Sequence, residues 1–574
     1  MMHKEDFWWR NSIGYVIYPS AYYDFNGDGV GDLRGIVSKL DYIASLGVDL
    51  LWICPFFDSP MDDNGYDVRD YYHVNPLFGS DEDFRLLIKE AHARGIRLLV
   101  DFVLNHTSDE HPLFQMALRH PKGKEAGYYY IRKGRRRKGK LYPPNNWKGY
   151  FSTSAWKRIE GTDKFYLHLF SEKMPDVNWE NKDLRQYYYN VARYYLDLGV
   201  DGFRLDAVSH LGKDQSFGDS ELPLDEDGMV LDSSKFANRE EVFSYLREFR
   251  EEVLDHYDCL TVAEAGGCLS PEDSLKMSDK EKGSIDMVFN FDCCWCNGAY
   301  GSIDKNDNEI HTDVLALKRN FKRWYLATKD HVSSLPLYWC NHDHPRALSQ
   351  YGDINFRKES GKMLITCLLF QYGTPFLYYG EEIGMSNVTY KSIRDFDIDI
   401  SAKNASAYFK KLGYKDDRIL SFLCRTSRVN GRQPMQWGKK RYASFSKVSP
   451  KTKVNPNYKD GVNVEDNEKD PSSILHYERK AAAIRKDPDI HKMIFEGRFA
   501  YIDEANYDVF AYCYFHKGEI LSVVCNFRSR NIEFYLPNPM DEVLLHNYDG
   551  YSYAKDRLIL RPFECLVVKG KRHG

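Results

Sequence analysis

Several apolar segments of this 574-residue chain end in a carboxylate, a group that can do chemistry. Asp206, Glu264, Asp343 and the pair Glu381-Glu382 all stand in this position. Two carboxylates at one site suit glycoside hydrolysis, in which one attacks the sugar and the other protonates the leaving oxygen. Because like charges that converge raise each other's pKa and cost stability, such a cluster indicates a chemical role more than a structural one.

The neighbouring residues indicate how the two roles divide. Arg204 precedes Asp206 by two residues, on the same face of an expected strand, and would keep Asp206 ionised as the nucleophile. Glu264 stands between "TVA" and "AGG", with no cation beside it in the sequence. A proton donor needs a raised pKa, so Glu264, in less solvated surroundings, is the better acid. The alternative is that Arg204 and Asp206 form a structural ion pair.

These carboxylates need a scaffold that brings strand ends together. Short apolar runs alternate with longer amphipathic patterns, which is typical of a parallel sheet with helical crossovers. The runs occupy residues 15–19, 49–57, 95–106, 200–208, 260–266, 285–292, 335–343 and 374–385. Eight units predict an α/β fold, a closed (β/α)₈ TIM barrel, in which the carboxyl ends of all strands share the face that carries the active site.

Two regions depart from this alternation. Residues 107–173 are too long for one helix and are rich in Tyr, Trp, Lys and Gly, which predicts an inserted subdomain B after the third strand. From 499 onward, short runs rich in β-branched and aromatic residues predict a C-terminal antiparallel β-sandwich. The expected barrel therefore consists of 1–106 and 174–498, followed by the β-domain at 499–574.

Bulk composition narrows the classes of partner. The net charge of −5 argues against a general nucleic-acid binder. The N-terminus lacks an apolar signal region, and no run approaches the eighteen apolar residues of a membrane span. Twelve scattered cysteines are typical of a reduced protein with buried thiols. We therefore expect a cytoplasmic protein that binds neither nucleic acid nor membranes and is a monomer or weak homo-oligomer.

The segment "DFNGDGVGD", at 24–32, has the pattern of an oxygen-lined metal loop. Acidic and amide residues stand at its first, third, fifth and ninth positions, and Gly29 stands at the sixth, as in an EF-hand loop. The twelfth position is Gly35, where an EF-hand has glutamate. Oxygen ligands and a glycine turn suit a hard cation. The alternative is a hydrated acidic turn without metal.

Four motifs give the chain a family resemblance. They are "DFVLNH" (101–106), "GFRLDAV" (202–208), "AEAG" (263–266) and "NHDHPR" (341–346). They look like the signature segments of the α-amylase superfamily (glycoside hydrolase family 13), and nearly the whole chain is most similar to its oligo-1,6-glucosidase and α-glucosidase branch. The resemblance implies a retaining, exo-acting α-glucosidase that acts on small oligosaccharides through a covalent glucosyl-enzyme and without an organic cofactor.

The resemblance also implies residue roles. Asp206 would be the nucleophile, Glu264 the general acid and then base, and Asp343 the group that holds the 2- and 3-hydroxyls of the sugar. Asp67 would bind the far hydroxyls and pair with Arg428, closing the pocket and making the enzyme exo-acting. The other implied substrate-binding residues are Tyr66, His106, Phe151, Phe170, Arg204, Ala207 and His342. A structural Ca²⁺ (or Mg²⁺) would be held by Asp24, Asn26, Asp28, Asp32 and the carbonyl of Val30.

Specificity is left open by the sequence. In this branch, Val directly after the nucleophile looks like α-1,6 preference and Ala looks like α-1,4 preference, so Ala207 favours α-1,4 with α-1,6 possible. The departures "MPDVN" (174–178) and Tyr379 lie where outer subsites are shaped. The same triad also serves transglycosylases and sugar isomerases, such as sucrose isomerases and trehalose synthases. A non-enzymatic transporter subunit is disfavoured because the triad is intact.

Overall fold

The centre of the molecule is a sheet of eight parallel strands. The structure is a computed structural model that describes residues 7–292, 300–306 and 310–571. The strands are β1 (Gly14–Ile17), β2 (Leu50–Ile53), β5 (Arg97–Val103), β11 (Gly202–Asp206), β12 (Leu260–Glu264), β13 (Met287–Phe289), β14 (Pro336–Leu337) and β15 (Thr374–Tyr378). Their order is β13-β12-β11-β5-β2-β1-β15-β14. Each overlaps one of the eight predicted apolar runs, which confirms the TIM barrel.

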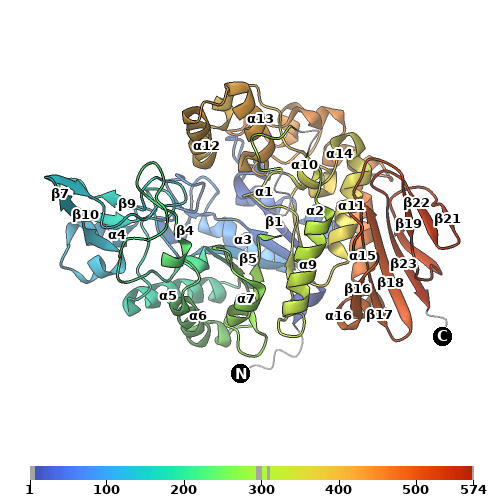
Figure 1. The fold of residues 1–574 in the computed structure, drawn as a ribbon, viewed down its shortest axis with the longest axis horizontal. Coiled ribbons are helices and arrows are strands. Elements are labelled where there is room, and N and C mark those ends of the chain that lie inside the picture. Colours follow the sequence, from blue (N-terminus) through green and yellow to red (C-terminus); the bar gives the residue numbers. More distant parts are fainter. Residues whose placement is uncertain (1–6, 293–299, 307–309, 572–574) are drawn as a thin grey trace.

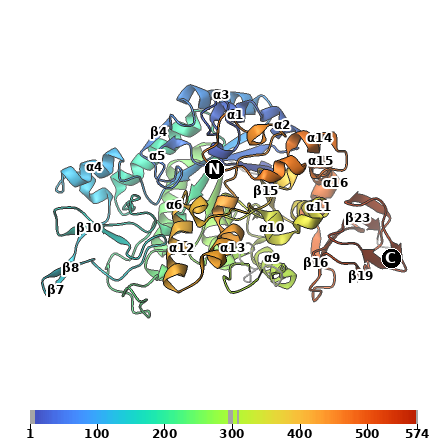
Figure 2. The ribbon, with the colours of Figure 1, turned by 90° about the horizontal axis from the view of Figure 1, so that it is seen from above.

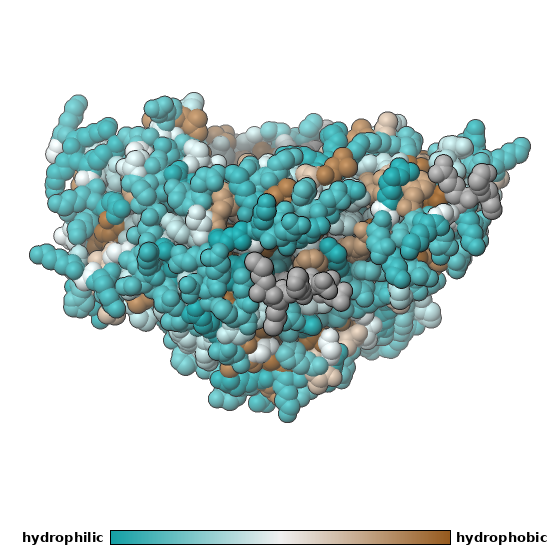
Figure 3. Space-filling view, turned by 90° about the horizontal axis from the view of Figure 1, so that it is seen from below, coloured by the Kyte–Doolittle hydropathy of each residue, from teal (hydrophilic) through white to brown (hydrophobic). Residues whose placement is uncertain are grey.

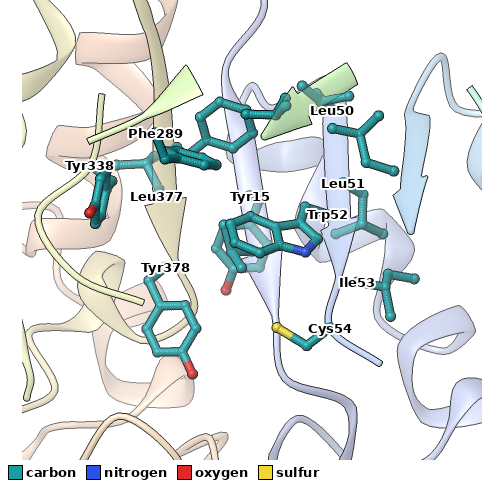
Figure 4. Packing of buried hydrophobic residues seen from close by; sticks show 14 of the residues in the cluster. Tyr15, Leu50, Leu51, Trp52, Ile53, Cys54, Phe289, Tyr338, Leu377 and Tyr378 are labelled. Atoms are coloured by element: carbon teal, nitrogen blue, oxygen red, sulfur yellow. The ribbon is translucent and has the colours of Figure 1, made fainter. Parts of the chain in front are cut away.

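The barrel closes through side chains between its two outermost strands. In the described part of the chain, β13 and β14 are the ends of the ladder. The ring of Phe289 in β13 and the ring of Tyr338, just after β14, lie 5.2 Å apart and fill this seam (Figure 4). Trp52 from β2 packs on Phe289 at 5.6 Å inside the barrel. The interior is therefore a packed aromatic core beneath the carboxyl ends of the strands.

Helices cover the outside of the barrel. They include α3 (Asp81–His92), α5 (Lys182–Asp197), α6 (Glu240–Glu252), α7 (Pro271–Ser278), α9 (Val314–Thr328), α11 (Arg357–Leu369) and α15 (Ile474–Arg485). The start of α3 is fixed by a capping box between Ser80 and Asp83, which satisfies N–H groups that the helix cannot. Most of α11 is buried, because it lies between the barrel and the C-terminal strands (Figure 1).

An insertion extends from one end of the barrel. Its strands β6 (Ile131–Lys133), β9 (Trp156–Arg158) and β10 (Lys164–Leu167) form a three-stranded antiparallel sheet. The hairpin of β7 (Arg135–Arg137) and β8 (Lys140–Tyr142) projects from it (Figures 1 and 2). We call residues 107–173 subdomain B.

The C-terminal strands form two antiparallel sheets at the opposite end of the molecule (Figure 1). The larger sheet is β16 (Arg498–Tyr501), β17 (Val509–His516), β18 (Glu519–Asn526), β23 (Cys565–Lys571) and β20 (Glu542–His546). The smaller sheet is β19 (Ile532–Tyr535), β22 (Arg557–Leu560) and β21 (Tyr553–Ala554). Apolar side chains of both sheets, including Val524 and Phe534, form one core between them. The antiparallel β-domain predicted from the sequence is therefore present.

Two helices between β15 and α15 lie above one end of the barrel. They are α12 (Ile400–Lys411) and α13 (Asp416–Thr426), and Figure 2 shows them in front of the barrel strands. We call them the roof helices. Hydrophilic side chains dominate the face of the molecule seen in Figure 3. No helix of the described chain is long and apolar enough to cross a membrane.

Candidate active site

A cavity of about 480 Å³ lies between the carboxyl ends of the barrel strands, subdomain B and the roof helices. Its lining includes nine of the predicted site residues, namely Tyr66, His106, Phe151, Phe170, Asp206, Ala207, Glu264, Asp343 and Arg428. A larger cavity of about 860 Å³ lies between the barrel and the C-terminal strands, and none of the three candidate catalytic carboxylates lines it. We therefore place the candidate site in the smaller cavity.

Arg204 joins two of the candidate catalytic carboxylates, Asp206 and Glu264. Its Nη1 donates to Oδ1 of Asp206 at 2.5 Å, and its Nη2 donates to Oε2 of Glu264. The register of β11 against β5 places Arg204 beside Asp101, and Nη1 also donates to Oδ1 of Asp101 at 2.7 Å. The guanidinium is almost fully buried, so its charge acts on all three carboxylates with little screening.

This geometry corrects the sequence-based reason for choosing the proton donor. Glu264 does have a cation beside it, because Arg204 reaches it from the neighbouring strand. Its side chain is also the more exposed of the pair, at 23% against 10% for Asp206. Burial and the nearby Glu264 raise the pKa of Asp206 well above its usual value although Arg204 lowers it, which is opposite to the net shift that the sequence predicted. Arg204 therefore contacts both carboxyl groups and does not by itself distinguish the proton donor from the nucleophile.

Asp343 is held ionised by two arginines and lies beside a histidine. Its Oδ1 accepts hydrogen bonds from Arg428 at 3.1 Å and from Arg432 at 3.0 Å, and its Oδ2 lies 3.0 Å from Nε2 of His342. Burial raises the pKa of Asp343, but His342, Arg432 and Arg428 together hold it well below its usual range. Such a carboxylate is an acceptor for two sugar hydroxyls over the whole physiological pH range.

The predicted pairing of Asp67 with Arg428 is wrong. Arg428 instead donates from Nη2 to Oδ1 of Asp63 at 2.8 Å, and Asp63 lines the cavity. The Asp67 side chain is fully buried, and its carboxylate accepts hydrogen bonds from the hydroxyl of Ser59 and the N–H groups of Asp62 and Asp63. Asp67 therefore fixes the loop that presents Asp63, and its own oxygens are turned away from the cavity.

Two other ring residues have polar atoms at the cavity. The hydroxyl of Tyr66 lies 3.1 Å from Oδ2 of Asp101 and 2.5 Å from Nε2 of His342. Burial, together with Lys213 and His210, lowers the pKa of His106 to about 3, so its imidazole is neutral. Nε2 of His106 is buried and has no hydrogen-bond partner in the described structure. It is therefore free to bind a sugar hydroxyl.

Aromatic rings from subdomain B form one wall of the cavity. The ring of Phe170 lies 5.2 Å from His106 and 5.7 Å from Phe151. The guanidinium of Arg428 lies over the Phe151 ring at 5.4 Å, within cation–π range. Phe151 and Phe170 thus offer flat apolar surfaces beside the charged groups, as a sugar-binding site requires.

Ala207 has a strained backbone directly after Asp206. Its φ is 49°, in the left-handed region that non-glycine residues rarely adopt. This turn ends β11 and leaves Asp206 and Ala207 side by side on the cavity wall. Strain of this kind costs on the order of 1–3 kcal/mol and is typical of functional sites.

Comparison with known proteins agrees with this site. Residues 16–493 match the family described as "Alpha amylase, catalytic domain". The chain belongs to the α-amylase family of glycoside hydrolases. An oligo-1,6-glucosidase of Bacillus cereus is 40% identical over 572 residues, which cover 98% of this chain and 99% of that protein.

Solved structures show the same relationship. The trehalose-6-phosphate hydrolase of Bacillus licheniformis superposes with a TM-score of 0.89 at 34% identity, covering 98% of this chain and 100% of that one. The isomaltulose synthase of Klebsiella sp. LX3 has a TM-score of 0.89 at 31% identity, covering 99% and 100% of the two chains. The same architecture therefore carries several sugar chemistries, and the fold alone does not choose among them.

Sequence reasoning missed four charged residues of this glycoside hydrolase site: Asp63, Asp101, Asp399 and Arg432. Asp101 is the first residue of the "DFVLNH" motif. The expected pairing of the third and fourth strands could have indicated that Asp101 lies beside Arg204. Asp399 accepts a hydrogen bond from Nε of Arg428 at 2.6 Å, and Arg432 binds Asp343. Asp399 and Arg432 lie in or next to a long irregular segment, where no sequence periodicity indicates which side chains point toward the cavity.

The pair Glu381-Glu382 does not join the catalytic cluster. Glu382 is 1% exposed and accepts hydrogen bonds from the hydroxyls of Tyr15 and Tyr42 at 2.7 and 2.9 Å. Burial raises the pKa of Glu381 to about 7. Asp206, Glu264 and Asp343 therefore line the cavity, whereas Glu381 and Glu382 do not.

The loop at 24–32 uses its predicted metal ligands to hold its own backbone. Asp24 accepts hydrogen bonds from three loop N–H groups and from the hydroxyl of Ser446. Asp32 accepts from three backbone N–H groups, of which that of Gly35 belongs to α1 (Leu33–Val37), so it caps this helix. Those N–H groups offset the repulsion that argued for a cation.

The carboxylates predicted to hold a cation are therefore engaged in hydrogen bonds within the loop. Among the described residues, no group of three or more His, Cys, Asp or Glu side chains is disposed to hold a metal ion. The Ca²⁺ or Mg²⁺ predicted for Asp24, Asn26, Asp28, Val30 and Asp32 stays a prediction. No step of the glycoside hydrolase reaction below depends on it.

Proposed function

We propose that the protein is a retaining, exo-acting α-glucosidase that releases glucose from the non-reducing end of short α-glucosides. One observation carries the proposal: Asp206 and Glu264 line the same cavity and are bridged by the single guanidinium of Arg204. With both carboxyl groups at one cavity, one can attack the anomeric carbon while the other protonates the leaving oxygen.

The reaction consists of two displacements at the anomeric carbon. In the first, a carboxylate oxygen of Asp206 forms a bond to C1 while Glu264 gives its proton to the glycosidic oxygen, which leaves with the bonding electrons. In the second, Glu264 takes a proton from water, whose oxygen bonds to C1 and displaces Asp206. Arg204 remains bound to both carboxylates and stabilises the charge that moves between them.

The remaining polar groups of the cavity fix one glucose. Asp343, held ionised, accepts the 2- and 3-hydroxyls, and Nε2 of His106 offers a further partner. Asp63 and Arg428 form an ion pair at the cavity wall, which closes the space on the non-reducing side of the terminal glucose. This closure supports exo-action, because an internal glucose of a chain would have to displace the pair.

The charge of the cavity supports a neutral leaving group over a phosphorylated one. Five carboxylates line the described cavity: Asp63, Asp206, Glu264, Asp343 and Asp399. Arg428 is the one arginine or lysine among the described lining residues, and three of these carboxylates already contact it. A phosphate group would therefore be repelled. We favour short neutral glucosides over a trehalose-phosphate substrate such as the one named for the Bacillus licheniformis relative.

Linkage preference has two candidates. Ala207 leaves space beside the nucleophile, and we favour α-1,4 hydrolysis on the family pattern at that position. The name of the Bacillus cereus relative favours α-1,6 as the second candidate. Differences of this size in pocket shape are worth about 1–3 kcal/mol, so both linkages are expected to be cleaved.

A kinetic panel tests the proposal. The substrates are maltose, isomaltose, sucrose, trehalose and trehalose 6-phosphate, with the anomeric form of released glucose followed by NMR. Release of α-glucose with a higher kcat/KM for maltose than for isomaltose is expected. Release of β-glucose would exclude the retaining mechanism. Isomerised disaccharide in place of free glucose from sucrose would favour an isomerase, as in the Klebsiella relative.

A further inference from the structure

Helix α12 is tied to the substrate-binding arginine at its first turn. Oδ1 of Asp399 accepts a hydrogen bond from the N–H of Ala402 at 3.0 Å, which caps the helix. Oδ2 of the same carboxylate accepts from Nε of Arg428 at 2.6 Å. Asp399 is 2% exposed, so this link is protected from water. The position of the roof helix is therefore coupled to the group that contacts Asp63 and Asp343.

The next turn of α12 reaches across the cavity to subdomain B. Ser401, Ala402 and Ala405 line the cavity from the helix, and the Phe151 ring lines it from the opposite side. Between them, Nδ2 of Asn404 donates a hydrogen bond to the carbonyl oxygen of Phe151 at 2.7 Å. This bond joins two segments 253 residues apart in the chain.

We propose that Asn404 is a positioning residue that holds Phe151 against the roof helix and thereby limits the length of substrate the cavity admits. The inference rests on the proposed α-glucosidase function, because the rest of the substrate, on the reducing side of the terminal glucose, must leave the cavity past this wall. Asn404 itself touches neither the terminal glucose nor the reacting atoms, and it acts through Phe151.

The strength of this contact predicts a graded effect. Asn404 is exposed, so water competes for its amide, and the bond is worth only a modest factor in population. A second contact joins α12 to the facing loops. It is the ion pair of Lys411 with Glu226 at 2.9 Å, whose side chains are 58% and 74% exposed. Such surface pairs contribute little and are screened by salt. The hydrogen bond of Asn404 is thus the more directional of the two constraints on the wall.

Two substitutions at Asn404 test the inference. Asn404→Ala removes the donor, and Asn404→Asp keeps the shape but places an acceptor against the carbonyl of Phe151. We expect both to raise the ratio of kcat/KM on maltopentaose to kcat/KM on maltose by about three- to tenfold. Lys403→Ala, at the neighbouring exposed position of the same helix, is the matched control and should leave this ratio unchanged.

A second measurement separates this inference from the proposed function. Amide hydrogen exchange of the segment 148–154 requires no substrate and should become faster in both Asn404 variants but not in the Lys403 control. If the wild-type enzyme cleaves maltose and neither ratio nor exchange responds to the substitutions, the role of Asn404 is refuted while the α-glucosidase stands. If the wild type cleaves no α-glucoside, the proposed function itself fails. A similar loss of activity on both substrates, with the stability of the protein unchanged, would also overturn the length-limiting role.

Discussion

Arg428 contacts Asp63, and the two charged groups lie 2.8 Å apart at the wall of the cavity. Because the side chains are only 11% and 6% exposed, removing either charge leaves the other buried without a full set of partners. Substitution of either residue is therefore expected to impair substrate binding. Asp67, close to Asp63 in the sequence, is expected to respond differently.

Asp63→Asn should weaken binding of the terminal glucose, whereas Asp67→Asn should weaken the fold. We expect Asp63→Asn to lower kcat/KM by about 10²-fold or more with little change in melting temperature, since a buried charge contact costs about 2–5 kcal/mol when cut. Asp67→Asn removes an acceptor of loop N–H groups and should lower the melting temperature instead. Equal behaviour of the two variants would contradict the assignment made here.

Asp206→Asn and Glu264→Gln should fail at different steps. Loss of the nucleophile is expected to reduce kcat on the order of 10⁴-fold for every substrate. Loss of the proton donor should matter about 10²- to 10⁴-fold for maltose but much less for an aryl glucoside with an acidic leaving group. Kinetics on both substrates check this, and an Asp206→Asn enzyme with wild-type activity would refute the mechanism.

Ala207→Val is expected to shift linkage preference toward α-1,6 and to cost stability. The larger side chain fills space beside Asp206, and a β-branched residue is poorly suited to a φ of 49°. We expect a fall in the maltose-to-isomaltose ratio of kcat/KM by about tenfold. Ala207→Gly, which relaxes the backbone without filling space, is the control and should leave the ratio in place.

Metal analysis tests the loop at 24–32. If a cation binds there, exhaustive dialysis against chelator should remove about one equivalent per chain and lower the melting temperature, and Asp28→Ala should abolish both effects. Asp28 is the variant of choice because it does not cap a helix. Identical metal content and melting temperature in wild type and variant would show that backbone hydrogen bonds alone order the loop.

Glu478 should make stability fall as pH rises. It lies in α15, is fully buried, and neither carboxyl oxygen has a hydrogen-bond partner in the described structure. Burial and the nearby Glu382 and Glu381 raise its pKa well above 4.5. A raised pKa in the folded state means that the native protein holds the extra proton, so stability declines above pH 4.5 until the folded pKa is passed.

Glu478→Gln removes this titration. The gain in stability over wild type should therefore be larger at pH 8 than at pH 5, by up to about 1.4 kcal/mol for each unit of pKa shift. Urea unfolding at the two pH values measures it. A gain that is equal at both, or larger at pH 5, would mean that the carboxyl group is not held protonated by the fold.

Much of this architecture could be predicted from the sequence because each strand is buried on both faces. Runs such as that of β2, LLWI, are continuously apolar, so their number and order could be read directly. The face shared by Arg204 and Asp206 followed from the two-residue period of a strand. Contacts across strands did not follow, and for that reason the approach of Arg204 to Glu264 and to Asp101 was found only in the structure.

The irregular segments defeated sequence reasoning for a different reason. Asp63 and Asp67 stand on either side of Tyr66 in one loop, and no repeat distinguishes an oxygen that faces the cavity from one that binds loop N–H groups. Asp399 could be expected to cap a helix, but its bond to Arg428 depends on how α12 lies over the barrel. The direction of a side chain in a loop depends on hydrogen bonds between distant segments, and these cannot be predicted from the sequence pattern.

The seam between β13 and β14 makes the barrel unequal around its circumference. Seven neighbouring pairs of strands share backbone hydrogen bonds, while this one is joined in the described structure by the rings of Phe289 and Tyr338. Ring contacts are lost at smaller displacements than the backbone hydrogen bonds of paired strands. On heating or under tension, the barrel should therefore open first between β13 and β14. Glu264 ends β12, which pairs with β13, and Asp343 follows β14, so separation of the seam would move these two carboxylates apart and abolish catalysis before the rest of the molecule unfolds.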